Sequence, residues 1–541
     1  MYVIDGHTGL SGVLARALTD VHPPLYYFFL YGWIQLTGVS EWAVRLPSAV
    51  FAVIALLVFA GGTRKVMTPA ASAFACAAAS GSAFWFEQSQ NARSYAMLLV
   101  ISAAMLTVAL ALRRQVHACK GFPLANWILL TVLGMAGSMA HSYMLLATGM
   151  LLFFLILTLR DLRLQMALVV SGLSILALYL SFLWLLMHAV NHDFQHTWFR
   201  SDFGFFAWDI RRAITHVVSW QSQVVAIALL FVLLIRRLRG VRQERDADVS
   251  TDDARWATAL CGFVLVGVVI SGIAVSILVA PSFSDRNVLT CAPFAWLLIA
   301  RLYDVAGPRL GSARSGVAIT AIVLLLGSQL ALLPGRMLPS NETWRAGADY
   351  IRQLPDCAGQ PVPVVIRSDS YGLDTPEMRR FVEQNYFGYY LPETMHPQAY
   401  LPDELVKHVS TKSRVGANEC SVIAWSEHDM KSADALKLAM ELARQPSMAA
   451  HGVVLQQLVG YGLRWLSWRP APNGYVLLRS QSSVLAPADV QASLTAEKEH
   501  AVGDRLLVRY ITQGTQPVEG IYSIQRWGAG QASSEKVAVP K

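Results

Sequence analysis

The sequence predicts an α-helical integral membrane protein, in which a bundle of about ten spans is followed by an extramembrane α/β domain. Three observations support this fold class. Of the 541 residues, 54% are hydrophobic and only 15% are charged, which lies outside the range of ordinary soluble domains. Apolar runs long enough to cross a bilayer recur as far as residue 334. From residue 335 the composition becomes that of a soluble domain of about 200 residues.

Membrane spans are expected where roughly 17 to 25 mostly apolar residues follow one another. Such runs lie at about 44–62, 68–86, 95–112, 124–140, 143–159, 165–189, 221–237, 256–280, 287–303 and 314–334. If the first of them runs from outside to inside, sixteen Lys and Arg residues fall in the inside loops and five in the outside loops. Positive charge favours the cytoplasmic side. This asymmetry therefore predicts the orientation, with the C-terminal domain outside, in the periplasm.

The segment "DVHPPLYYFFLYGWIQLTG", residues 20–38, precedes the first full span and is apolar but short. On the predicted orientation it lies outside, so residues 25–37 are expected to form an interfacial or re-entrant helix with Trp33 and the tyrosines at headgroup level. A short tilted span is the alternative. The predicted organisation is thus an outer-face loop over residues 1–43, a transmembrane bundle over 44–334 and a periplasmic α/β domain over 335–541.

The C-terminal domain has the coarse pattern of a small α/β unit. Strands are expected at 362–369, 421–427, 474–480, 505–511 and 520–526, and helices at 375–387 and 432–445. Cys357 and Cys420 each stand just before one of the first two strands, so a disulfide is feasible if these strands are neighbours, and free thiols are the equal alternative. The last residues, "GAGQASSEKVAVPK", are expected to be disordered.

Composition and charge exclude several classes of function. The net charge of +8 comes mostly from short loops between apolar runs, so it indicates topology rather than nucleic-acid binding. The six cysteines include no CxxC and no Cys/His cluster, so no motif supports a metal site, and a requirement for a divalent cation is left open. His188, His192 and His196 are expected to lie in a solvated loop rather than to bind metal.

Charged side chains are nearly absent from the middles of the spans, whereas transporters and channels usually carry ionisable or broken-helix features there. Charged and polar side chains gather instead at the outer helix ends, which indicates chemistry at one membrane face on a lipid-anchored substrate. The group consists of Asp5, His7, Asp20, His22, Glu87, Asn91, Arg93, His141, His188, His192, Asp193, His196, Arg200, Asp285 and Arg286.

Four segments within this group carry recognisable motifs. They are "DVHPPLYY" (20–27), "RLPS" (45–48), "EQSQNARSYAM" (87–97) and "SFSDRNVLTCAPF" (282–294). In this order and at these spacings they resemble the polyprenyl-phosphate-sugar-dependent glycosyltransferases of the GT-C fold. The RgtA/B/C/D-like branch is the most similar, and the protein O-mannosyltransferases and the aminoarabinose transferase of lipid A are more distant. The resemblance covers about residues 20–335.

The resemblance implies a bacterial inner-membrane glycosyltransferase. Such enzymes take a sugar from a polyprenyl phosphate in the outer leaflet and pass it, with inversion, to a glycan, lipid or protein acceptor outside. An acid would act as general base on the acceptor hydroxyl, and cations would stabilise the phosphate leaving group. Two other functions stay open: transport or flipping of a lipid-linked saccharide, and a non-catalytic membrane scaffold that binds saccharide.

The resemblance also implies roles for individual residues. The catalytic candidates are Asp5, Asp20 and His22, and the candidates for substrate binding are Arg45, Asn91, Arg93, Tyr95 and Arg286. Structural alternatives stand beside these roles. The arginines could be interfacial anchors or helix-end ion pairs, and Tyr95 could serve packing alone. Asp20 could cap the short helix, with Pro23 at its first position.

The chain departs from the family pattern at its beginning. The family usually has a first transmembrane helix followed by an acidic pair that supplies the base. This sequence begins inside the outer loop without a signal peptide, Asp5 is the sole acid upstream of Asp20, and Asn91 stands where the family often has Glu. The expectation is that the native protein begins upstream of Met1. The alternative is a protein that has lost its activity.

Overall fold

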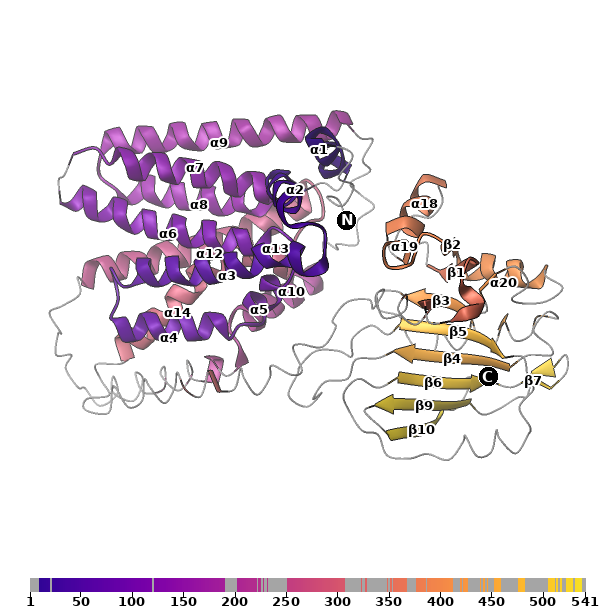
Figure 1. The fold of residues 1–541 in the computed structure, drawn as a ribbon. Coiled ribbons are helices and arrows are strands. Elements are labelled where there is room, and N and C mark those ends of the chain that lie inside the picture. The colour runs from indigo at the N-terminus through magenta and orange to yellow at the C-terminus, as the bar shows by residue number, and fades with distance from the viewer. Residues whose placement is uncertain are drawn as a thin grey trace. The chain divides into compact units, whose positions relative to one another are not determined.

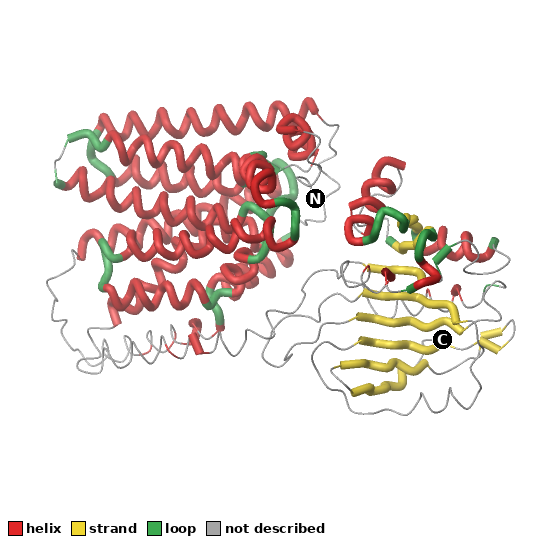
Figure 2. Tube along the Cα trace, viewed as in Figure 1, coloured by secondary structure: helices red, strands yellow, loops and turns green. Residues whose placement is uncertain are grey.

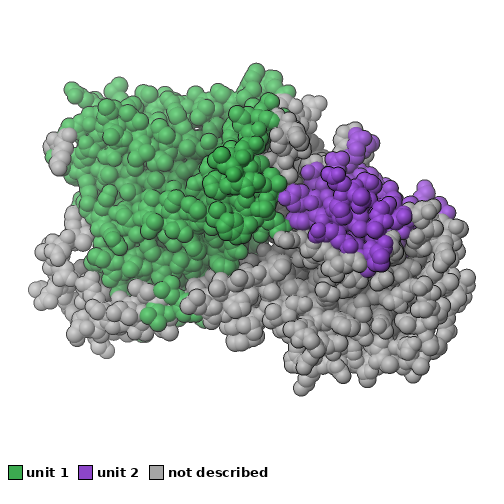
Figure 3. All heavy atoms as spheres, viewed as in Figure 1, with its two compact units in different colours: residues 1–329 green, residues 330–541 purple. Residues whose placement is uncertain are grey.

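A computed structural model gives the fold as two compact units, residues 1–329 and 330–541, which are described separately (Figure 3). In the first unit the structure describes residues 9–19, 22–118, 121–189, 202–220 and 251–306. In the second it describes 354–366, 376–411, 419–426 and the later strands. Single-residue gaps and short isolated pieces complete this coverage.

The first unit is a helical bundle (Figures 1 and 2). Its described helices are α1 (Gly9–Thr19), α2 (Leu25–Thr37), α3 (Glu41–Thr63), α4 (Pro69–Ser80), α5 (Ala83–Ser89), α6 (Tyr95–His117), α7 (Leu124–Ala140), α8 (Ser142–Thr158), α9 (Leu162–Ala189), α10 (Phe203–Val217), α12 (Thr251–Leu278), α13 (Asp285–Val288) and α14 (Ala292–Ala306). A 3-10 turn, Leu289–Cys291, joins the last two.

Five helical stretches among the described residues are long and apolar enough to cross a membrane. They are Glu41–Thr63, Tyr95–His117, Leu162–His188, Asp252–Leu278 and Asp285–Val305. Pro69–Ser80, Leu124–Ala140 and Ser142–Thr158 are shorter apolar helices. Most of the predicted span 221–237 and of 314–334 lies outside the described residues, so the count of ten spans stays a prediction.

The predicted span 68–86 is wrong as a continuous helix. α4 ends at Ser80, and α5 begins anew after Ser82, whose Oγ accepts a hydrogen bond from the Trp85 N–H at 3.1 Å. An N-cap serine of this kind starts a helix because it pairs a backbone donor that has no partner within the helix. Hydropathy does not register such a cap, so an apolar run can hide the break.

Helix α2 has the bounds expected for the short apolar helix. It begins at Leu25 directly after Pro24, so Pro23 precedes the helix and does not start it. At the other end Gly38 takes a φ of 81° and donates its N–H to the Ile34 carbonyl, a conformation that glycine adopts without strain. Thirteen residues rise about 20 Å, less than the ~30 Å hydrocarbon core. A location at the outer surface remains a prediction.

The C-terminal end of α6 is joined to the N-terminal end of α12 by a partly buried charge cluster. The Arg113 side chain is 7% exposed, and its Nε donates to Asp253 Oδ1 at 2.9 Å. Nη2 of the same guanidinium pairs with Asp252, and the group lies 4.9 Å from the centre of the Trp256 ring. These contacts satisfy a buried cation from three sides, so the two helix ends depend on it.

The second unit contains a mixed sheet of eight strands, in the order β10-β9-β6-β4-β5-β3-β1-β2 (Figure 1). β1 pairs in parallel with β2 and β3, and the remaining pairs are antiparallel. The strands are β1 (Pro361–Val365), β2 (His396–Tyr400), β3 (Val422–Ser426), β4 (Gly452–Leu458), β5 (Tyr475–Gln481), β6 (Arg505–Tyr510), β9 (Tyr522–Gly528) and β10 (Gln531–Val537); β7 (Thr512–Gln513) and β8 (Gln516–Pro517) form a separate pair.

A 3-10 helix, Pro355–Cys357, precedes β1, and the α-helices with described bounds lie between β1 and β3 in the sequence. They are α18 (Pro376–Asn385), α19 (Phe387–Tyr390) and α20 (Pro402–Ser410). The sequence prediction missed β2, β4 and β10. It was wrong to expect disorder over residues 531–537, because β10 pairs there with β9 along its full length. Small and charged side chains mask a strand when the backbone ladder decides the pairing.

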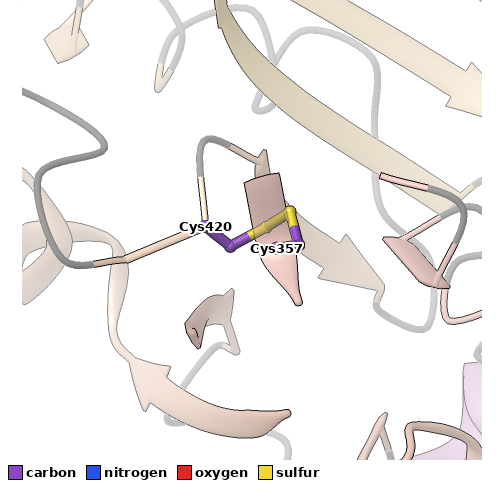
Figure 4. The surroundings of a disulfide bond; sticks show 2 residues. All are labelled: Cys357 and Cys420. Atoms are coloured by element: carbon purple, nitrogen blue, oxygen red, sulfur yellow. A yellow bond between two sulfur atoms is a disulfide. The ribbon is translucent and has the colours of Figure 1, made fainter. Parts of the chain in front are cut away.

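A disulfide joins Cys357 to Cys420, which decides between the two alternatives left open by the sequence (Figure 4). The bond is possible because the condition set by the sequence holds, namely that β1 and β3 are neighbours. In addition, the Cys420 N–H donates to the Pro361 carbonyl at 2.9 Å, which brings the two cysteine backbones together. Both side chains are buried in the core of this unit.

Replacing Arg113 with alanine should lower the free energy of unfolding by about 2–3 kcal/mol, because Asp253 would lose a partly buried partner. Its neighbour Arg114 is 44% exposed and lies 3.7 Å from Asp253, so Arg114→Ala should cost about 0.5 kcal/mol. Thermal unfolding of the two purified variants in detergent measures the difference. Equal losses in both would contradict the buried cluster.

Replacing Cys357 and Cys420 together with serine should destabilise the second unit by about 4 kcal/mol, because the bond links residues 63 apart and restricts the unfolded chain. Thermal unfolding with and without reductant tests this. Reductant should lower the transition of the wild-type protein and leave the double variant unchanged. Peptide mapping without reduction should recover the linked pair, and its absence would rule the bond out.

Candidate functional site

Three of the sequence motifs meet through a chain of hydrogen-bonding groups. The Ser48 hydroxyl, from "RLPS", donates to the Asn91 carbonyl at 2.6 Å. Tyr26, from "DVHPPLYY", brings its hydroxyl to 3.4 Å from the same serine oxygen. Tyr26 and Ser48 are both buried. The contacts therefore join α2, α3 and the turn between α5 and α6, and Figure 1 shows α2, α5, α10 and α13 at the same end of the bundle.

Tyr95 lies where the third motif meets the fourth. Its hydroxyl donates to Asn287 Oδ1 at 3.5 Å, and its ring lies 5.5 Å from that of His141, between centroids. Arg93 and Arg286, from different motifs, both lie close enough to act electrostatically on this hydroxyl. Both arginines are exposed, whereas Tyr95 is 6% exposed. The fold thus brings two separate cations to one buried phenol.

His141 lies in the turn between α7 and α8, with its ring beside that of Tyr95. Its Nδ1 accepts the Tyr143 N–H at 3.2 Å, and the ring interacts with the side chain of Asn287. Burial, with a smaller contribution from His22, lowers the pKa of His141 to about 3. The ring is therefore neutral at physiological pH, and with Nδ1 accepting it carries its proton on Nε2. The His22 ring lies 6.5 Å away, centroid to centroid.

Helix α10 contributes charged residues that the sequence prediction did not assign to the site. Asp209, Arg212 and His216 follow one another at three and four residues, so they share one face of the helix. This face meets Asp285, which is buried and pairs with His216 at 3.0 Å and with Arg212 at 3.4 Å. This spacing is present in the sequence, but residues 203–217 lie between two predicted spans, where no helix is predicted.

Asp209 is the most constrained group on this face. It is 4% exposed, and its Oδ2 has no hydrogen-bond partner among the described residues. Burial, reinforced by the Asp285 carboxylate, raises the pKa of Asp209 to about 6. Two buried carboxylates therefore lie side by side, and the Arg212 guanidinium of α10 offsets part of their repulsion.

The remaining predicted residues fall into three sets. Asp5 and Asp20 lie outside the described residues, as do His192 and His196. Arg45 is exposed near the start of α3, one turn before Ser48. His188 ends α9 with its ring 4.3 Å from that of Trp184, centroid to centroid. Within the described ranges, no three His, Cys, Asp or Glu residues form a group that could hold a metal ion.

This arrangement is suited to binding an anion. Arginine presents several N–H donors in a fixed plane and matches the oxygens of a phosphate. Two exposed arginines beside a buried tyrosine, a neutral histidine and an asparagine supply charge and hydrogen-bond donors with defined positions. Asn91 contributes its backbone carbonyl to the hydrogen bond from Ser48, and the turn it belongs to leads directly to Arg93.

Comparison with solved structures gives distant neighbours. ArnT from Cupriavidus metallidurans bound to undecaprenyl phosphate is 12% identical, with a TM-score of 0.44, over 86% of this chain and 92% of that one. The oligosaccharyltransferase of Archaeoglobus fulgidus in complex with Zn and sulfate is 11% identical, with a TM-score of 0.38, over 85% of this chain and 68% of that one. No curated protein matches the sequence.

Comparison with protein families gives one match, to dolichyl-phosphate-mannose-protein mannosyltransferase, over residues 21–185. The matched stretch holds the first three motifs, whose residues converge through Ser48, together with His141. The resemblance to the protein mannosyltransferases predicted from the motifs is confirmed over this stretch: residues 21–185 of the chain are related to the dolichyl-phosphate-mannose-protein mannosyltransferases.

Proposed function

We propose that this protein is a membrane glycosyltransferase of the GT-C type, which moves a sugar from a polyprenyl-phosphate donor to an acceptor on the outer face of the membrane, with inversion. The relationship of residues 21–185 to a family named for a dolichyl-phosphate sugar supports a lipid-linked donor. The helical character of the first unit supports an enzyme that meets its donor in the bilayer. The acceptor is a glycan, a lipid or a protein.

The observation that carries the proposal is the contact between Tyr95 and Asn287 at 3.5 Å, which brings together the two motifs that hold Arg93 and Arg286. Arg93 is two residues before Tyr95, and Arg286 is next to Asn287. The two arginines are 193 residues apart in the sequence, and the fold brings both near the Tyr95 hydroxyl. A phosphate held there would lose its sugar with the developing charge already compensated.

The roles of the other candidates follow from this arrangement. Arg93 and Arg286 contact the donor phosphate. Tyr95 and Asn287, which are hydrogen-bonded to each other, determine where the phosphate binds between the two arginines. Arg45 and the turn at Asn91 border the donor. A carboxylate near the "DVHPPLYY" motif, Asp20 or Asp5, acts as base on the acceptor hydroxyl, with His22 beside it. The protein is placed in the bacterial inner membrane, with its second unit in the periplasm.

The transferase is distinguished from a transporter by the fate of the donor. The full-length protein, reconstituted in vesicles, is given polyprenyl-phosphate sugars labelled in the sugar, together with candidate acceptors. A transferase releases polyprenyl phosphate and labels the acceptor. A flippase moves the labelled lipid between leaflets without changing it, and a scaffold binds saccharide and does neither. Intact donor across the whole panel would refute the proposal for those donors.

Arg93→Ala and Arg286→Ala should each reduce donor turnover about 10- to 100-fold, the loss expected for one charge-assisted hydrogen bond to phosphate. The matched control is Arg160→Ala, which removes an exposed arginine in the turn between α8 and α9. Initial rates of polyprenyl phosphate release at one donor concentration below saturation compare the three variants. Unchanged rates in both site variants would show that these arginines only anchor the protein at the headgroups.

A further inference from the structure

Arg286 lies in α13, a single turn over Asp285–Val288, which the 3-10 turn Leu289–Cys291 continues into α14. A single turn contributes little stability of its own, so the first residues of this stretch depend on contacts with their surroundings. Ser284 caps it by accepting the Asn287 N–H at 3.3 Å. Asn287 Nδ2 also donates to the Ser282 carbonyl at 2.8 Å. These local contacts fix the shape of the turn, but they do not fix its position in the bundle.

Asp285, the first residue of α13, joins the start of this turn to α10. Asp285 Oδ2 lies 3.0 Å from His216 Nδ1 and 3.4 Å from Arg212 Nε, and the aspartate side chain is 5% exposed. His216 can donate from Nδ1 in its neutral or its protonated form, and Arg212 remains charged at all relevant pH values. Because the aspartate of this ion pair is buried, solvent and salt screen the interaction less than they screen an ion pair at the surface.

Helix α10 is well anchored as a base for this pair. At its start, Asp202 Oδ1 accepts the Phe205 N–H at 2.8 Å. At its end, Trp296 Nε1 donates to the Val217 carbonyl at 3.1 Å. Between them Phe206 packs its ring 5.4 Å from that of Phe283, between centroids. Arg212 and His216 therefore belong to a helix that contacts α14 through Trp296 and the segment before α13 through Phe283.

We propose that Arg212 and His216 are positioning residues, which act through Asp285 to hold α13 so that Arg286 and Asn287 face Tyr95. The inference rests on the proposed function, because it takes Arg286 to contact the donor phosphate. It assigns to α10 a part in donor binding, although neither Arg212 nor His216 contacts the donor. By binding Asp285, these two residues determine the positions of Arg286 and Asn287, which follow it in the chain.

Asp209 makes the contact between α10 and α13 sensitive to the loss of these partners. Its buried carboxyl lies beside Asp285 and takes a hydrogen bond from the Asp285 backbone, and the two carboxylates repel each other when both are ionised. Arg212 brings a positive charge to Asp285, and His216 brings a hydrogen-bond donor. Without either residue the buried Asp285 carboxylate loses one of these two side-chain partners. Loss of either partner is therefore expected to displace Arg286.

The test uses the full-length protein and four variants. Arg212→Ala and His216→Ala remove one partner each. His216→Asn keeps an amide donor near the position of Nδ1 and should rescue. Arg211→Ala is the matched control, because Arg211 is exposed on the other face of the same helix. Thermal unfolding of each variant confirms that it is folded before the comparison.

The first measurement needs no activity. Hydrogen–deuterium exchange of the peptide that covers residues 281–291 should be faster in Arg212→Ala and His216→Ala than in the wild type. It should be unchanged in Arg211→Ala and nearly restored in His216→Asn. Unchanged exchange in both alanine variants would overturn the inference, whatever the protein catalyses.

The second measurement is the donor dependence of the rate. The two alanine variants should raise the donor KM about tenfold, with a smaller change in kcat, while Arg211→Ala and His216→Asn stay close to the wild type. Faster exchange without a change in donor KM would overturn the positioning role and leave only a structural link. A wild-type protein that consumes no donor would defeat the proposed function, and the exchange result would still decide whether the link exists.

Discussion

The end of the bundle that carries the candidate site depends on the hydrogen bond that the Ser48 hydroxyl donates to the Asn91 carbonyl, which also accepts the Arg93 N–H at 2.8 Å. Ser48 is buried within an apolar helical unit, where an unpaired hydroxyl would be unfavourable. The bond from Ser48 therefore holds the turn between α5 and α6 against α3. It also sets where α6 begins, and hence where Tyr95 stands. Tyr26 reaches the same serine, so α2 is fixed to that point as well.

A second layer of polar contacts extends from Tyr95 away from this bond. Asn287 links Tyr95 to the segment before α13, and neutral His141 contacts both Tyr95 and Asn287. The opposite end of the unit has a different character, because there Arg113 and two aspartates bind helix ends together with full charges. Charged groups contribute strongly at the end that holds Arg113, whereas the site end combines hydrogen bonds between uncharged groups with exposed arginines.

The sequence predicted what apolar periodicity and motif order determine. The long helices, the short helix Leu25–Thr37 and the grouping of the motif residues follow from runs of apolar side chains and from residues placed at helix ends. The break at Ser82 was missed because a cap is a single polar atom in an apolar run. Asp209, Arg212 and His216 were missed because their partner, Asp285, lies about 70 residues later, and no local pattern records such a pairing.

The disulfide in the second unit has a topological consequence. Cys357 and Cys420 enclose β1, α18, α19, β2 and α20, so two of the three strands in the parallel part of the sheet lie on a covalently closed ring of chain. A single cut by a protease anywhere within this ring would leave both fragments attached to each other. β3 and the antiparallel strands from β4 onward have no such enclosure. The edge of the sheet formed by β1 and β2 can therefore survive nicking in an oxidising compartment, while the other strands depend on their hydrogen bonds.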